Sequence, residues 1–113
     1  MPQAFEIETE KDGGVGTVRV AGELDLNASA RLDEALSALD GSVDVIVLDL
    51  RGVTFIDSTG LRTITSADAR AREGRYELRI VRGSENVQKL LHMTGMDKIL
   101  PLVDDPSETP GPR

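Results

Sequence analysis

One acid and two hydroxyl residues stand together near the middle of the chain, in the run Asp57-Ser58-Thr59-Gly60-Leu61. The run follows an apolar segment and opens a stretch of helical periodicity, which predicts Ser58 at or beside a helix N-cap, with Asp57 just before it. Backbone N–H groups and the positive end of the helix dipole favour an oxygen acceptor there, including a phosphate. Two interpretations remain open: a phosphate site, or a helix start that Asp57 or Ser58 merely caps. Gly60 either lets another molecule approach the backbone or simply fits.

The residues around Ser58 do not form a catalytic set. A nucleophile elbow needs a glycine two positions before the serine, and Ile56 stands there instead. The single imidazole, His92, is expected on the surface of a later helix. The chain has neither a P-loop nor a dinucleotide-binding glycine motif, and it has no cysteine. We therefore expect no enzyme, no cofactor and no metal site; a small serine hydrolase using Ser58 and His92 is the enzyme alternative.

Composition narrows the possible partners. The 113 residues have a net charge of −7, which argues against direct binding to a nucleic acid. Seven arginines and four acids lie between residues 51 and 82, whereas three basic and eleven acidic residues lie between 1 and 50. This uneven distribution of charge predicts either a protein-docking surface with a positive and a negative region, or ordinary charged side chains exposed to solvent. Apolar runs are too short to cross a membrane and no leader is recognisable, so we expect a cytoplasmic domain with no membrane contact.

The first half of the chain predicts a hairpin, a helix and a central strand. Alternating residues at 5–8 and 17–24 flank the turn residues 11–14, which is typical of an antiparallel hairpin. Apolar spacing of three and four over 32–39 predicts a helix, capped by Asn27 or Ser29 and ended by Gly41. The nearly continuous apolar run 43–50 predicts a central strand covered on both faces.

The second half predicts two more helices and two strands. The helices are expected over 61–74 and after Ser84, with Gly95 as a left-handed cap. A strand is expected over 76–82, and a short strand or extended segment over 99–103. Residues 104–113 hold three of the five prolines and are expected to be a frayed tail. The prediction is an α/β fold: one domain over 1–103, with a mixed sheet of four to five strands and three to four helices.

Within this predicted order of elements, two motifs resemble those of the STAS-domain anti-sigma factor antagonists, also called anti-anti-sigma factors. One is the run from Asp57 to Leu61, and the other is Gly22-Glu23-Leu24-Asp25 at the end of the hairpin. The resemblance extends from about Phe5 to Val103. Family members often have Ser or Thr where Ala28 stands, and this departure moves the expected cap to Asn27 or Ser29.

The resemblance implies a phosphorylation switch. A partner that is both anti-sigma factor and serine kinase would bind the unmodified protein, free the sigma factor, and phosphorylate Ser58; a phosphoserine phosphatase would reset the cycle. Asp57 would help to place the serine. The residues implied for partner binding are Glu23, Asp25, Asp57, Ser58, Thr59, Gly60 and Leu61. Two alternatives lack a kinase cycle: an adaptor on a transporter ATPase or stress-sensing scaffold, and a structural subunit in which Ser58 only caps.

Overall fold

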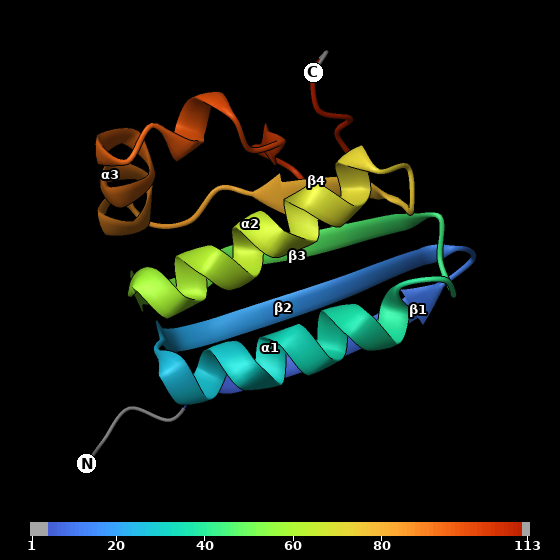
Figure 1. Ribbon diagram of the computed structural model, residues 1–113, viewed down its shortest axis with the longest axis horizontal. Helices are drawn as coiled ribbons and strands as arrows, with labels where there is room; N and C mark the ends of the chain where they lie inside the picture. The colour runs from blue at the N-terminus through green and yellow to red at the C-terminus, as the bar shows by residue number, and fades with distance from the viewer. Residues whose placement is uncertain (1–4, 112–113) are drawn as a thin grey trace.

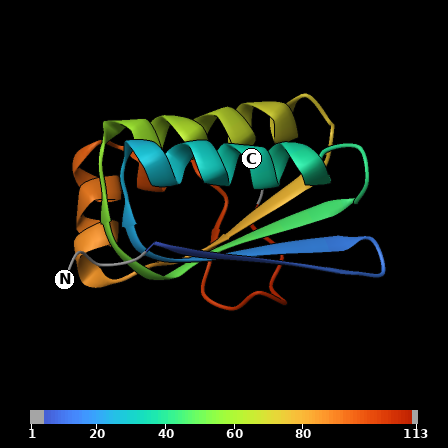
Figure 2. The same ribbon diagram turned by 90° about the horizontal axis from the view of Figure 1, so that it is seen from below.

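The chain folds into one five-stranded sheet with its helices packed on one face (Figures 1 and 2). The computed structural model describes residues 5–111. The sheet order follows the chain, with only the first pair of strands antiparallel. The elements are β1 (Glu6–Asp12), β2 (Val15–Leu24), α1 (Leu26–Leu39), β3 (Val45–Ile56), α2 (Ser58–Arg72), β4 (Glu77–Val81), α3 (Glu85–Met93), the 3-10 turn η1 (Met96–Lys98) and β5 (Leu102–Val103). The predicted α/β class and mixed sheet are confirmed.

The opening hairpin forms because two glycines allow a tight turn. Gly13 and Gly14 have φ values of +53° and +85°, which side-chain-bearing residues rarely adopt. The turn fixes the register, in which Ile7 lies opposite Val20 and Asp12 opposite Val15. Alternate residues of β2 then face the helices, so its period-two pattern becomes a half-buried strand.

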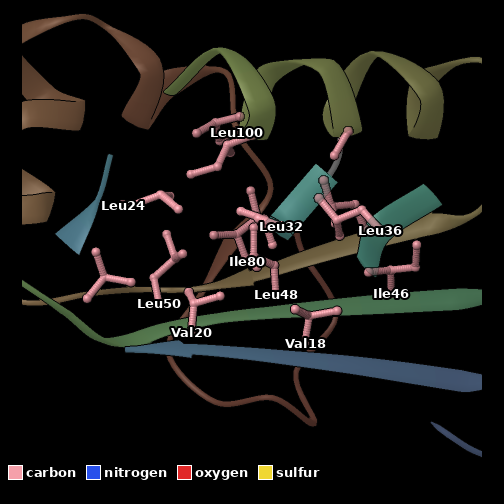
Figure 3. Close-up of a cluster of buried hydrophobic side chains, with 14 of the residues drawn as sticks. Val18, Val20, Leu24, Leu32, Leu36, Ile46, Leu48, Leu50, Ile80 and Leu100 are labelled. Carbon is pink, nitrogen blue, oxygen red and sulfur yellow. The ribbon is translucent and has the colours of Figure 1, made fainter. Parts of the chain in front are cut away.

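The core lies between the sheet and the helices, as Figure 3 shows. Leu32 and Leu36 of α1 are fully buried against it, and Ile64 does the same from α2. The central strand supplies Ile46, Leu48 and Leu50 to the same core (Figure 3). Removal of this apolar surface from water is the main force that holds both helices on the sheet.

The opposite face of the sheet carries a smaller apolar cluster of Val47, Val81 and Val103. The C-terminal segment crosses this face (Figure 2), where Pro106 O accepts a hydrogen bond of 3.4 Å from Arg79. Local bonds also hold the segment, since Glu108 accepts from the backbone N–H groups of Asp104 and Asp105. The fraying predicted for this tail stays a prediction, and residues 112–113 lie outside the described part.

Several predicted boundaries were wrong. The central strand does not stop at Leu50 but continues to Ile56, because Val53 and Ile56 still face the core after Gly52. The last strand, predicted over 99–103, is Leu102–Val103, since residues 99–101 connect η1 to this strand. The start of the second helix is confirmed, since α2 begins at Ser58 with Asp57 as its N-cap, and Gly74 follows the helix with a φ of +85°. The left-handed cap at Gly95 and the Ser84 cap of α3 are confirmed.

Among residues 5–111 no helix has the length and apolar character needed to span a bilayer.

Candidate functional site

Two strand–helix junctions lie side by side at one end of the domain. The first joins β2 to α1 (residues 24–29, the β2–α1 junction), and the second joins β3 to α2 (residues 56–61, the β3–α2 junction). The parallel register pairs Leu24 with Ile56, and Asp57 N donates to Leu24 O at 3.3 Å. Both strands bend towards the helices at this end (Figure 2). The two predicted motifs, more than thirty residues apart in sequence, therefore meet at one surface.

Asp57 is the N-cap of α2. Its Oδ1 accepts hydrogen bonds of 2.9 Å from the backbone N–H groups of both Thr59 and Gly60. The Thr59 hydroxyl donates a third bond to the same oxygen at 2.5 Å. Three donors on one carboxylate oxygen fix the first turn of the helix.

The same donors hold the pKa of Asp57 below its ordinary value. The Thr59 hydroxyl has the largest effect, followed by the Gly60 N–H, and both stabilise the charged form. Asp57 is therefore a permanent anion at neutral pH. Because its charge is engaged in capping, Asp57 positions the helix start that carries Ser58.

Ser58 is the first residue of α2 and is exposed. No hydrogen bond joins its hydroxyl to any other residue in the described range 5–111. The neighbouring hydroxyl differs: Thr59 is only half-exposed and is bonded to Asp57. Of the two hydroxyls in the motif, Ser58 is thus the one presented to an incoming molecule.

Gly60 is buried where α2 contacts β2. A Cβ atom at this position would lie 2.7 Å from Leu24 O and 2.8 Å from Leu24 Cγ. Ordinary contacts are longer, so no side chain fits without movement. Of the two roles predicted for Gly60, the geometry supports close packing within the chain.

The β2–α1 junction repeats this construction with Asp25 as its N-cap. Its carboxylate accepts one bond of 3.0 Å, from Ala28 N. The predicted cap at Asn27 or Ser29 was wrong, because α1 begins at Leu26, almost two turns before the apolar stripe that predicted it. Ser29 is instead buried in the first turn, with its hydroxyl bonded to Asp25 O at 2.6 Å. That hydroxyl lies 3.5 Å from Thr59 Oγ1, which links the two helix starts.

The remaining predicted site residues differ in exposure. Glu23 is exposed near the end of β2, in register with Phe55 of β3. Leu61 is half-buried and packs against the core. Glu23 therefore belongs to the free surface of the junctions, whereas Leu61 mostly anchors α2.

Exposed apolar side chains beside the junctions were missed by the sequence analysis. Leu26 is 67% exposed and Phe55 is 51% exposed. Phe55 also lines a groove of about 270 Å³ between β3 and α3, together with Leu90 and Met93. Their positions in the sequence could have indicated them, because Leu26 directly follows one capping aspartate and Phe55 precedes the other by two residues.

His92 is not part of the site. Its side chain on α3 is 74% exposed, and Nδ1 lies 2.8 Å from Asp97 Oδ2. The predicted surface position is confirmed, and within residues 5–111 no hydrogen bond connects His92 to Ser58. The geometry therefore gives no support to a serine hydrolase.

The fold and the paired junctions define an α/β domain with an exposed serine at one end. The sequence model of the STAS domain matches residues 6–109, and the chain belongs to the STAS-domain family of anti-sigma factor antagonists. It is 36% identical to the anti-sigma F factor antagonist of Paenibacillus polymyxa, over 89% of this chain and 88% of that one. It is 31% identical to the anti-sigma-B factor antagonist of Staphylococcus aureus, over 85% and 90% of the two chains.

Solved structures show the same fold. An anti-sigma factor antagonist from Mycobacterium paratuberculosis superposes with a TM-score of 0.81 at 26% identity, covering 93% of this chain and 90% of its own. The Bacillus cell fate determinant SpoIIAA in its phosphorylated form gives a TM-score of 0.67 at 20% identity, covering 88% and 91%. The second likeness concerns the fold alone.

Proposed function

We propose that this domain is an anti-sigma factor antagonist switched by phosphorylation at Ser58. The unmodified form binds an anti-sigma factor that is also a serine kinase, and the bound anti-sigma factor releases its sigma factor. Phosphorylation ends the binding, and a phosphoserine phosphatase restores it. The domain is a substrate and a binding partner in this cycle, not an enzyme, and it acts in the cytoplasm, where sigma factors work.

The observation that carries the proposal is the free, exposed Ser58 hydroxyl at the start of α2. In the transfer, Ser58 Oγ forms a bond to the γ-phosphorus of ATP while the bond from that phosphorus to ADP breaks. The hydroxyl proton passes to a base of the kinase, since Asp57 Oδ1 already accepts three hydrogen bonds and the lowered pKa of Asp57 makes its carboxylate a weak base. Thr59 is the weaker phosphate acceptor, because its hydroxyl donates a hydrogen bond to Asp57.

The surface around Ser58 suits a protein partner. Leu26 and Phe55 offer exposed apolar area, and Glu23 and Asp25 surround it with negative charge. Such a combination of apolar anchors and a charged rim is typical of specific protein interfaces. Thr59, Gly60 and Leu61 contribute by holding the first turn of α2 in place.

Phosphorylation ends the binding through charge. A phosphate adds about −1.5 to −2 at neutral pH, next to the anions Asp57 and Asp25. Like charges forced together in a water-poor interface cost several kcal/mol. A penalty of roughly 3 kcal/mol weakens binding about a hundredfold. The change is local, because the phosphate is placed on an exposed residue.

A binding and transfer experiment with candidate anti-sigma factors tests the proposal. Ser58→Ala is expected to keep partner affinity and to lose phosphate uptake, as mapped by mass spectrometry after incubation with ATP. Ser58→Glu is expected to weaken binding by about tenfold or more, measured by calorimetry. Ser37→Ala is the matched control, because it removes an exposed hydroxyl from the later part of α1 and leaves Ser58 and the helix caps unchanged.

Uptake of phosphate by Ser58→Ala at another residue would refute the assignment. Equal affinity of Ser58→Glu and the parent would refute the charge mechanism. Partner binding without any phosphate transfer would favour the adaptor alternative, on a transporter ATPase or a stress-sensing scaffold.

A further inference from the structure

Among the arginines that the structure describes, in residues 5–111, Arg62 is the one whose side chain has no partner. Nine of the ten arginines lie within the described residues 5–111. Eight of these pair with or donate to groups of the chain itself. Within that range, the side chain of Arg62 makes no ion pair or hydrogen bond, and the residue is exposed. The unmodified domain therefore leaves this one guanidinium charge uncompensated.

The helix that carries Arg62 offers it no counter-ion. Residues three and four positions away share a face of an α-helix and are the ones that form pairs. Around Arg62 these residues are Ser58, Thr59, Thr65 and Ser66, all of them uncharged. The positive end of the helix dipole acts within the first turn, so it gives a cation in the second turn no stabilisation. Neither effect gives Arg62 a stabilising role in the unmodified protein.

The position of Arg62 matches an anion on Ser58. The two residues are four apart on α2, a spacing that places their Cβ atoms about 6 Å from each other. Helical side chains lean towards the N-terminus, so the long Arg62 side chain extends in the direction of Ser58. Pairs with the acid N-terminal to the base are the more favourable orientation.

We propose that Arg62 is the counter-ion of the phosphate carried by Ser58. The guanidinium donates charge-assisted hydrogen bonds to the phosphate oxygens, a geometry that its planar fork suits. The inference rests on the proposed function, because it presupposes a phosphate at Ser58. The pair holds the phosphate over α2 and offsets its repulsion from nearby Asp57.

The other charged groups at this end are few. Asp57, Asp25 and Glu23 are acidic and disfavour a second negative charge on the phosphate. Lys89 of α3 lines the groove that Ile56 also lines, and Arg31 lies in the second turn of α1, where it is engaged with the Phe5 carbonyl and ring. The second pKa of the phosphate therefore reports the balance between these groups and Arg62.

The test uses the full chain with phosphoserine installed at position 58 during synthesis, so no kinase is needed. The second pKa of the phosphate is followed by phosphorus NMR. Arg62→Gln is expected to raise it by about 0.15 to 0.4 units, because loss of the cation disfavours the dianion. Lys11→Gln removes one exposed charge from the β1–β2 turn, at the far end of the sheet, and is expected to leave the pKa unchanged. Lys89→Gln is expected to have the smaller effect of the two nearby cations, since Lys89 lies on another helix.

Thermal denaturation of the same proteins gives an independent measurement. Phosphorylation is expected to raise the midpoint more in the parent than in Arg62→Gln, and equally in the parent and Lys11→Gln. Equal pKa values in Arg62→Gln and Lys11→Gln would overturn the proposal. So would an Arg62→Gln variant that binds the partner less tightly when unmodified, with no change in the phosphate pKa. If the pKa shift appears but no anti-sigma kinase modifies Ser58, the ion pair stands and the proposed function fails.

Discussion

The two junctions have nearly the same backbone but different chemistry. Their capping residues Asp25 and Asp57 have φ/ψ values of −94°/−169° and −94°/−176°. Each follows a buried apolar residue at the end of a parallel strand, and each accepts a bond from the N–H three residues later. The residue after the cap differs, however: Leu26 exposes an apolar side chain, whereas Ser58 exposes a hydroxyl.

This difference shows that the capping residue has a structural role, whereas the exposed residue after it determines the chemistry of the surface. The capping acid satisfies backbone donors and so fixes the helix start, which leaves the next residue free to face the solvent. In one junction that free position offers apolar contact, and in the other it offers a site for modification. The third helical position also differs, since Ala28 fits the first junction and only glycine fits at position 60 of the second.

The largest expected effect on stability comes from making the third residues of α1 and α2, Ala28 and Gly60, alike. Gly60→Ala is expected to lower the free energy of unfolding by about 1 to 3 kcal/mol, because its Cβ would collide with Leu24. The reverse change, Ala28→Gly, is expected to cost about 1 kcal/mol through lost helix propensity. Urea denaturation measures both. A Gly60→Ala domain as stable as the parent would show that the junctions pack alike.

Removal of the caps is expected to have the next largest effect. Asp25→Ala is expected to cost about 1 kcal/mol of stability. Asp57→Ala is expected to cost more, because the Asp57 carboxylate accepts three hydrogen bonds and the Asp25 carboxylate accepts one. The matched control is Asn27→Ala, which removes an exposed polar residue of the same helix start and is expected to change stability by less than about 0.5 kcal/mol. Equal losses for the two aspartates would contradict the ranking.

The smallest expected effect is a pH dependence of the stability that the Asp57 cap gives to the β3–α2 junction. The pKa of Asp57 is lowered by the Thr59 hydroxyl and the Gly60 N–H, so the folded state favours the charged carboxylate. The stabilisation is fully present above the unfolded value of about 3.9 and is lost as the pH falls through the lower folded value. The stability difference between the parent and Asp57→Asn is therefore expected to shrink below about pH 4. A difference that stays constant from pH 7 to pH 3 would count against the charged cap.

Most of the fold and part of the site were predictable from local patterns. Turn glycines, apolar periodicity and the Ser84 cap each act within a few residues, and the structure confirms the elements that they predicted. Errors arose where distant residues decide the outcome. The strand to Ile56 continues past Gly52 because β2 pairs along its whole length, and no local signal announces that pairing.

Local sequence patterns were enough to predict the order of the elements, the two acidic strand ends and the position of Ser58, because these depend on neighbours within one turn or one strand. Three features became evident only in the folded chain: the two motifs share one surface, Gly60 lies against Leu24, and Arg62 has no partner within the described residues. The physical reason is that exposure and pairing depend on which remote segment covers a residue, and the parallel register of β2 and β3 sets that arrangement.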